Sequence, residues 1–341
     1  MQPRLNISFP LRGQYAFWFD RTYSPQAGEY LLNHARTGIV MALRAALPNG
    51  GKVGVVAYNC YTVANAVVNA GCTPMFVDVM EDLRIDVQYL AALTLDAIVV
   101  TNLFGIHNDI EAIRKAQPNA IIIVDNAHGY GMPTEGDFTI YSINQGKMPA
   151  LGAGGLLWVN SEQYQDAIEK QYSQLTGYSI VAEIKLFASM LLKAWMHNPL
   201  IYGMITLPIK TNRRGGTCRE RVVMKRMAKG VSRMYQATLP TIDKQIQQFK
   251  THAQYIVKVW QEYGFGSQVW YGENAFMLIG RNDNPQEVKA FFAKHGVEVA
   301  THFAKTIEWA KEFGYTEGQC PMAEKLTKEL IMIPTYKKID L

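Results

Sequence analysis

Two stretches decide the fold: IIIVDNAHG at residues 121–129 and FTIYSINQGKMPALGAGG at residues 138–155. Each opens with a short run rich in Val, Ile or aromatic residues and ends in polar residues or glycine, the pattern of a strand buried on both faces. Strand patterns fall at 53–57, 74–79, 96–101, 120–125, 138–143 and 156–159. Helical patterns separate them, at 30–46, 61–70 and 110–116. This alternation predicts an α/β fold with a large, mostly parallel sheet sandwiched by helices.

The pattern changes after Leu239. A long amphipathic stretch at 241–263 predicts one helix that leaves the large domain and leads into a smaller α+β unit. Its expected strands are 268–271, 275–280, 297–302 and 330–333, and its expected helices are 285–294 and 304–313. We therefore expect a large domain at residues 1–240, with an apolar and basic insertion at about 183–233, and a small C-terminal domain at residues 241–341.

The amino-acid composition limits the classes of function that this chain can have. The chain has 341 residues and a net charge of +5, which is too small to indicate nucleic-acid binding but suits an anionic small molecule. Its four cysteines are far apart, which predicts neither a disulfide framework nor a metal site and favours a reducing cytoplasm. The N-terminal residues MQPRLNISFPLRG lack the apolar core of a secretory signal, and no uninterrupted apolar run is long enough for a membrane span, so a cytoplasmic location is expected.

Asp125 follows a buried strand, at the edge of a parallel sheet where ligands bind. A carboxylate there either holds a protonated ring nitrogen or forms a turn or helix cap. Lys147 comes 22 residues later, in a glycine-flanked turn five residues after Ser142. A loop lysine is usually solvated, whereas a lysine used for imine chemistry must be partly desolvated so that its amine is available near neutral pH.

Residues 33–159 resemble the large domain of the DegT/StrS family of sugar aminotransferases, which depend on pyridoxal 5'-phosphate (PLP) and have the type I fold. The resemblance rests on YSINQGKMPALGAGG at 141–155 and on TPMFVDV at 73–79, TNLFG at 101–105 and VDNAHG at 124–129. Residues 296–336 resemble the ending of the family's small domain. The resemblance implies a fold-type I PLP-dependent transferase over most of the chain.

The resemblance also implies roles for four residues. Lys147 would carry the cofactor as a Schiff base and shuttle the proton between substrate and cofactor. Asp125 would pair with the pyridinium nitrogen, and His128 would hydrogen-bond the phenolic oxygen. Ser142 would contact the phosphate. Read without the family, His128 is equally consistent with a structural role at a turn, whereas Ser142 is either a strand serine or a phosphate ligand, and its spacing to Lys147 favours the ligand.

This chain departs from the family pattern in the phosphate-binding turn. The family has Ser-Gly-Thr at the start of the first long helix, where this chain has His34-Ala35-Arg36-Thr37. The backbone amides of Ala35 and Arg36 would still face the phosphate, and the Arg36 guanidinium would add a charge-assisted bond. An exposed arginine at a helix start is the alternative.

Two further departures concern the ring and the neighbouring subunit. In the family, an aromatic residue covers the cofactor ring. This chain has Cys60 at the corresponding position, between Tyr58 and Tyr61, and one of these three is expected against the ring. The family places an asparagine of the partner subunit before an Arg-Met pair. Here Met224 and Lys225 precede Arg226-Met227, so a different residue would make that contact.

Two segments lie outside these motifs. One is a run of cations that either forms a solvated surface or binds the diphosphate of a nucleotide-sugar. Its members are Lys210, Arg213, Arg214, Arg219, Arg221, Lys225, Arg226, Lys229 and Arg233. The other is the apolar stretch 183–210, which is core, a dimer interface or a peripheral membrane contact flanked by lysines.

The resemblance implies an aminotransferase and a homodimer. An amino acid such as glutamate would convert PLP to pyridoxamine phosphate (PMP), which would then aminate a keto sugar linked to a nucleotide or a lipid. Cell-surface polysaccharide or amino-sugar biosynthesis would be the setting. The alternatives are a PLP-dependent sugar-modifying enzyme of another reaction type, such as a dehydratase, and a catalytically inactive or regulatory homologue. Dehydrating family members replace the lysine, so Lys147 argues against that reaction.

Overall fold

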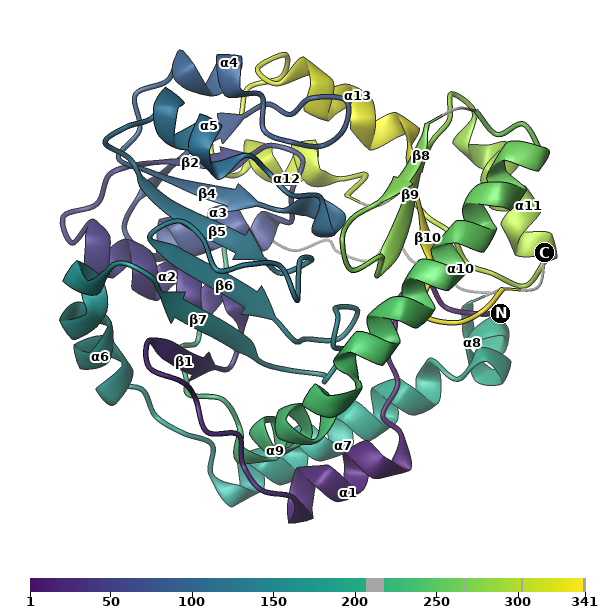
Figure 1. The fold of residues 1–341 in the computed structure, drawn as a ribbon, viewed down its shortest axis with the longest axis horizontal. Helices are drawn as coiled ribbons and strands as arrows, with labels where there is room; N and C mark the ends of the chain where they lie inside the picture. The colour runs from purple at the N-terminus through teal and green to yellow at the C-terminus, as the bar shows by residue number, and fades with distance from the viewer. Residues whose placement is uncertain (207–217, 267, 302, 340–341) are drawn as a thin grey trace.

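A computed structural model describes the chain except for residues 207–217, 267, 302 and 340–341 (Figure 1). Two sheets lie side by side, and a long diagonal helix, α10 (Ile242–Glu262), joins the large unit to the small one. The larger sheet has seven strands in the order β1-β7-β6-β5-β4-β2-β3. The strands are β1 (Glu29–Leu32), β2 (Lys52–Val56), β3 (Thr73–Val77), β4 (Ala97–Thr101), β5 (Ile121–Asn126), β6 (Phe138–Ser142) and β7 (Gly155–Val159).

Five neighbouring strands, β2 to β6, are parallel, while β7 is antiparallel to β6 and β1 is antiparallel to β7. Alternate side chains enter different cores: Ala97 and Val99 of β4 pack on one face, and Ile98 and Val100 pack on the other. This is the mostly parallel α/β fold that the sequence predicts. The strands need apolar residues on both faces because helices cover both.

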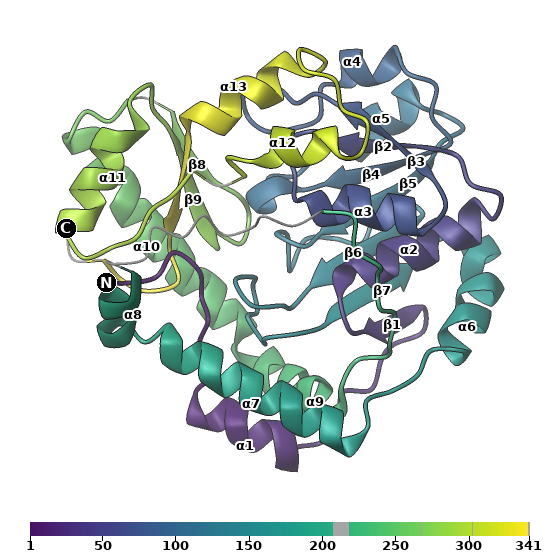
Figure 2. The same ribbon diagram turned by 180° about the vertical axis from the view of Figure 1, so that it is seen from behind.

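Helices cover the sheet on both faces. Figure 2 shows α2 (Ala35–Ala46) and α3 (Tyr61–Asn69) over one face. The other helices before α10 are α1 (Leu11–Phe19), α4 (Val87–Ala91), α5 (Ile110–Ala116), α6 (Gln165–Ser173), α7 (Ile180–Met196), α8 (Pro199–Thr206) and α9 (Lys229–Thr238), with 3-10 turns η1 (Leu103–Gly105), η2 (Glu162–Tyr164) and η3 (Leu239–Thr241). No helix among the described residues is long and apolar enough to cross a membrane.

The small unit has a three-stranded antiparallel sheet in the order β10-β9-β8. Its elements are β8 (Val269–Tyr271), β9 (Met277–Arg281), α11 (Pro285–Lys294), α12 (Thr306–Lys311), α13 (Pro321–Glu329) and β10 (Leu330–Pro334). The N-terminus, which we expected in the large domain, packs here instead: the Gln2 N–H donates to the Gly296 carbonyl at 2.6 Å. The division at residue 240 otherwise remains a prediction.

Two expected elements are corrected. The helix expected at 30–46 begins only at Ala35, because Tyr30, Leu31 and Leu32 belong to β1 and pair with β7. A short apolar run is compatible with either structure, and the pairing decides. Residues 297–302 form no strand among those described; Val297 and Ala300 make only isolated bridges, to Gln2 and Met332.

Candidate active site

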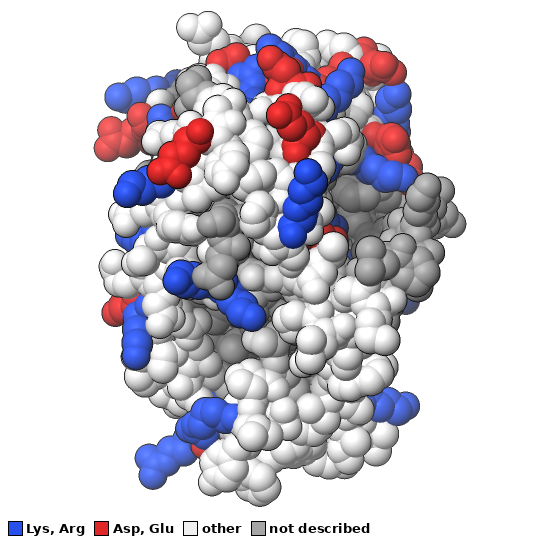
Figure 3. All heavy atoms as spheres, turned by 90° about the vertical axis from the view of Figure 1, so that its right-hand side faces the viewer, with Lys and Arg blue, Asp and Glu red and all other residues white. Residues whose placement is uncertain are grey.

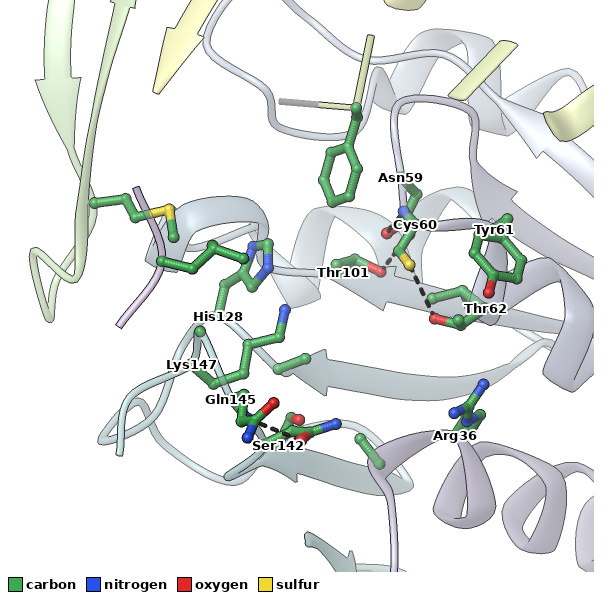
Figure 4. Close-up of a pocket in the computed structure, with 18 of the residues that line it drawn as sticks. Arg36, Asn59, Cys60, Tyr61, Thr62, Thr101, His128, Ser142, Gln145 and Lys147 are labelled. Atoms are coloured by element: carbon green, nitrogen blue, oxygen red, sulfur yellow. Dashed lines mark hydrogen bonds between the residues drawn. The ribbon is translucent and has the colours of Figure 1, made fainter. Parts of the chain in front are cut away.

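A cavity of about 960 Å³ opens at the carboxyl ends of the parallel strands, between the two units (Figure 4). It is lined by seven of the eight residues that we predicted to bind the cofactor. These are Ala35, Arg36, Cys60, Asp125, His128, Ser142 and Lys147. They come from α2, the turn before α3, the ends of β5 and β6 and the loop between β6 and β7. The parallel sheet therefore brings together residues more than 100 positions apart.

Asp125 is a buried anion near the end of β5. Its carboxylate accepts the Ala127 N–H at 3.0 Å and the Thr101 hydroxyl at 3.4 Å, and Thr101 in turn accepts the Asn59 amide at 2.8 Å. Burial raises the pKa of Asp125, and the Ala127 N–H and the charge of Lys147 only partly oppose this. No described lysine or arginine forms a salt bridge with it. A buried carboxylate without a direct cationic partner fits a protonated ring nitrogen.

Lys147 lies half-buried in the loop that links β6 to β7. Figure 4 shows its side chain directed into the cavity. Two backbone hydrogen bonds hold the loop. The Gly146 N–H donates to the Asn6 carbonyl at 2.9 Å, and the Lys147 N–H donates to the Asn144 carbonyl within the loop at 3.2 Å. Burial lowers the pKa of Lys147, against the opposing influence of Cys60 and Asp125. A lowered pKa increases the fraction of neutral, nucleophilic amine at neutral pH.

His128 is buried against the rings of Phe104, Phe276 and Phe303. Its Nδ1 atom accepts the Phe104 backbone N–H at 3.1 Å. Because a backbone amide can only donate, the neutral ring must carry its proton on Nε2. That nitrogen is therefore a hydrogen-bond donor, as required of a residue that contacts a phenolic oxygen.

The predicted phosphate turn lies at the start of α2. Arg36 lines the cavity, and in the view of Figure 4 Ser142 lies between it and Lys147. The chain passes so close here that a Cβ atom built on Gly155 would lie 2.3 Å from the Ala35 nitrogen. Only glycine permits this approach, which brings the α2 start, with its positive dipole end, beside the strand that follows Lys147. The arrangement fits a phosphate group.

Tyr58 is the exception among the predicted cofactor residues. It is fully buried, its ring packs edge-on against Phe303 at 5.6 Å, and it does not line the cavity. Cys60 and Tyr61 do line the cavity, so of the three residues predicted for the cofactor ring these two remain candidates. Tyr58 differs because it lies two residues after the end of β2, where its side chain enters the core between the two units.

Several cavity residues were missed from the sequence. Arg4, Tyr202 and Glu298 form one wall, where the Tyr202 hydroxyl and the Arg4 N–H both donate to Glu298, at 2.6 and 3.1 Å. His197 and Lys305 also line it. No local motif marks these residues. They meet only because the N-terminus, the insertion and the small unit pack together, at sequence separations of 96 and 294 residues.

The described members of the run of cations do not line the cavity. Lys210, Arg213 and Arg214 lie outside the described residues, and none of the other six lines the cavity. Arg226, for example, donates to the carbonyls of Tyr172 and Ser173 and packs over the Tyr172 ring. The cations that do line the cavity are Arg4, Arg36, Lys147 and Lys305.

His34 makes the apoprotein sensitive to acid. Burial, with Arg36 and Lys193 nearby, lowers the pKa of His34 from 6.5 to about 4. As the pH falls, the His34 imidazole is therefore protonated at a higher pH in the unfolded chain than in the folded one. The free energy of unfolding is highest above about pH 6.5 and decreases towards pH 4. His34→Gln should lose less stability over this range. Denaturant midpoints at pH 7.5, 5.5 and 4.5 measure this, with exposed His295→Gln as control; equal losses in both variants would contradict it.

A half-buried lysine and a buried aspartate without a described salt bridge, at the carboxyl edge of a parallel sheet, are what the fold-type I class of PLP-dependent enzymes requires. Within that class, a model of the DegT/DnrJ/EryC1/StrS aminotransferase family matches residues 31–341, and the chain belongs to this family. The described residues fit the cofactor: a carboxylate for the ring nitrogen, an amine for the imine, and a hydroxyl and an arginine for the phosphate.

Three known proteins illustrate the similarity. The sugar aminotransferase CalS13 from Micromonospora echinospora shares 15% identity at a TM-score of 0.71, over 98% of this chain and 95% of that one. The putative sugar aminotransferase Spr1654 from Streptococcus pneumoniae, in its PMP form, shares 16% identity at a TM-score of 0.70, over 97% and 93%. A pleiotropic regulatory protein from Geobacillus stearothermophilus is 22% identical over 326 residues, which are 88% of this chain and 78% of that protein.

Proposed function

We propose that this protein is a PLP-dependent aminotransferase that moves an amino group from an amino acid, glutamate, to a keto sugar carried on a nucleotide or a lipid. Amino-sugar or cell-surface polysaccharide biosynthesis is the proposed setting. The proposal is carried by one observation: the Lys147 amine and the Asp125 carboxylate line the same cavity, and both have pKa values shifted by burial.

The cofactor supplies an electron sink for the carbon from which the proton is removed. Asp125 keeps a proton on the ring nitrogen, which the cofactor needs in order to act in this way. Lys147 has its amine free for proton transfer because burial lowers its pKa, and it moves the proton at the substrate carbon that bears nitrogen. The Nε2–H of His128 donates to the phenolic oxygen and orients the ring. Ser142 and Arg36 hold the phosphate.

The rest of the cavity suits an anionic acceptor. A volume of about 960 Å³ is at the upper end of the range for ligand pockets, enough for a cofactor and a sugar together. Arg4 and Lys305 line the cavity outside the predicted cofactor site, Arg4 4.0 Å from Glu298 and Lys305 3.9 Å from Glu308, and a carboxylate or a sugar-linked phosphate would be bound between these two cations. We also propose a cytoplasmic homodimer, since enzymes of this class build each site at a subunit boundary.

The proposal predicts a half-reaction that needs no sugar. Protein reconstituted with PLP should absorb visible light, and glutamate should bleach this absorbance while one equivalent of 2-oxoglutarate per site is released. Absorbance spectroscopy and a keto-acid assay measure the two changes. If borohydride attaches no cofactor to Lys147, the PLP assignment is wrong. A bound cofactor that responds to no amino acid would instead indicate an inactive or regulatory homologue.

A further inference from the structure

The outer side of α7 is unusually apolar. Its inner side packs into the protein: the Phe187 ring lies 5.2 Å from Phe17 and 5.3 Å from Trp18, and Met190 is buried. On its outer side, Ile184 and Leu192 remain 52% and 56% exposed. A helix that is apolar all round is normally covered all round, so the exposed side of α7 lacks a covering surface in the monomer.

The exposed apolar residues of α7 form a stripe. Val181, Ile184, Ala188, Leu192 and Trp195 follow one another at intervals of three or four residues, which places them on one side of the helix. The stripe is therefore a continuous apolar surface that runs from the first turn of α7 to its last turn.

The helix that follows continues this apolar character. On α8, Leu200 and Met204 are one turn apart and 82% and 78% exposed. Ten of the fourteen large hydrophobic side chains that are exposed in the described part of the chain belong to α1, α7 and α8. Scattered exposed apolar residues are normal, but this concentration marks an interaction surface.

The charges on α7 are arranged for an anionic partner. Its two lysines, Lys185 and Lys193, are exposed. Its one acid, Glu183, is buried and accepts the backbone N–H groups of Lys229 and Gly230 at 2.8 and 3.3 Å, so it adds no negative charge to the surface. In Figure 3 the lower part of the molecule, towards α1 and α7, is largely uncharged, and the charges seen there are mainly Lys and Arg.

We propose that the α7–α8 face, defined as the exposed apolar residues of α7 and α8 together with Lys185 and Lys193, docks on the surface of an anionic lipid bilayer. Apolar residues beside lysines are the composition of a helix that lies in a bilayer interface, whereas subunit interfaces are depleted in lysine. The other side of α8 carries Tyr202, which lines the cavity. Docking therefore brings one wall of the candidate active site next to the membrane.

The main experiment compares vesicle binding of full-length variants. Wild-type protein should co-sediment with vesicles of phosphatidylglycerol and phosphatidylcholine, and at least tenfold less with phosphatidylcholine alone, because anionic lipid attracts the lysines. Ile184→Glu with Leu192→Glu should reduce binding at least tenfold. Met80→Glu with Tyr263→Glu is the matched control, since it adds the same charge at residues 41% and 56% exposed elsewhere and should bind normally.

A conservative variant distinguishes loss of membrane contact from misfolding. Brominated phosphatidylcholine mixed with phosphatidylglycerol should quench the tryptophan fluorescence of the wild type, and Trp195→Phe should remove most of that quenching while it still sediments with vesicles. Trp195 is 61% exposed, and phenylalanine keeps the site apolar.

Two outcomes would overturn the proposal. One is wild-type protein that stays in the supernatant with every vesicle. The other combines two results: the wild type binds no vesicles, and the mass of the glutamate double variant in analytical ultracentrifugation is half that of the wild type. That combination would make the face a subunit interface. Neither measurement depends on the proposed reaction, because vesicle binding and subunit mass need no cofactor. Failure here would therefore leave the aminotransferase assignment standing.

Discussion

Lys147→Ala should lower aminotransferase activity by about 10³–10⁴-fold and abolish the covalent attachment of PLP. The variant loses both the amine that forms the imine and the group that moves the proton. Among the described residues, the other lysine that lines the cavity is Lys305, which comes from the small unit and has a side chain 49% exposed, 3.9 Å from Glu308.

Borohydride reduction followed by mass spectrometry of tryptic peptides measures the attachment, and 2-oxoglutarate release measures the activity. Lys305→Ala is the matched control, since it removes a lysine from the same cavity. It should keep the cofactor fully attached, even if sugar binding weakens. Attached cofactor in Lys147→Ala, or its loss in Lys305→Ala, would move the imine to another residue.

Asp125→Asn should have the second-largest effect, a loss of activity on the order of 10²–10³-fold with the cofactor still attached to Lys147. Asparagine keeps the size of the side chain and an oxygen for the Ala127 N–H, but it carries no charge to hold the proton on the ring nitrogen. The loss should therefore appear in kcat for the glutamate half-reaction, and covalent attachment should be unchanged.

The same substitution should stabilise the apoprotein at neutral pH. Burial raises the pKa of Asp125 in the folded state, so the ionised carboxylate costs stability above that pKa. This cost disappears as the pH falls below the usual carboxyl pKa of about 4, where both states are protonated. The melting temperature of Asp125→Asn should exceed that of the wild type at pH 7.5, with a smaller difference at pH 4.5.

A matched aspartate should behave in the opposite way. Burial acts to raise the pKa of Asp137, but the Ile122 N–H, Arg114 and Ser161 outweigh it and the pKa is lowered. Asp137→Asn should therefore destabilise the protein at pH 7.5 and leave the half-reaction unchanged. If both variants shift stability in the same direction, burial is not what distinguishes Asp125.

The core of the fold was predictable because its signals are local. β5 and β6 are short apolar runs that end in polar or glycine residues, and the ends of parallel strands meet at one edge of a sheet. That rule places Asp125 and Ser142 at one edge of the sheet, and the resemblance to the family added Lys147, in the loop after Ser142, to the same site. β1 was missed because its four residues carry no pattern of their own, and only pairing with β7 makes them a strand.

The side-chain directions were less predictable. Tyr58, Cys60 and Tyr61 are near neighbours in sequence, yet Tyr58 enters the core while the other two face the cavity. The conformation of the turn between β2 and α3 decides this. A resemblance to a family indicates which sequence position corresponds to a functional residue, but not which way the side chain at that position points.

The sequence by itself determined the class of fold, because strand burial, turn residues and strand-end positions depend on short segments, and its resemblance to a family singled out Lys147 and Asp125 as candidate site residues. Only the tertiary structure decided which distant segments line the cavity, since Arg4 and Tyr202 contact Glu298 across 294 and 96 residues of sequence. It also decided that one side of α7 stays exposed. An apolar helix has the same sequence whether or not something covers it, and its exposure depends on what packs against it.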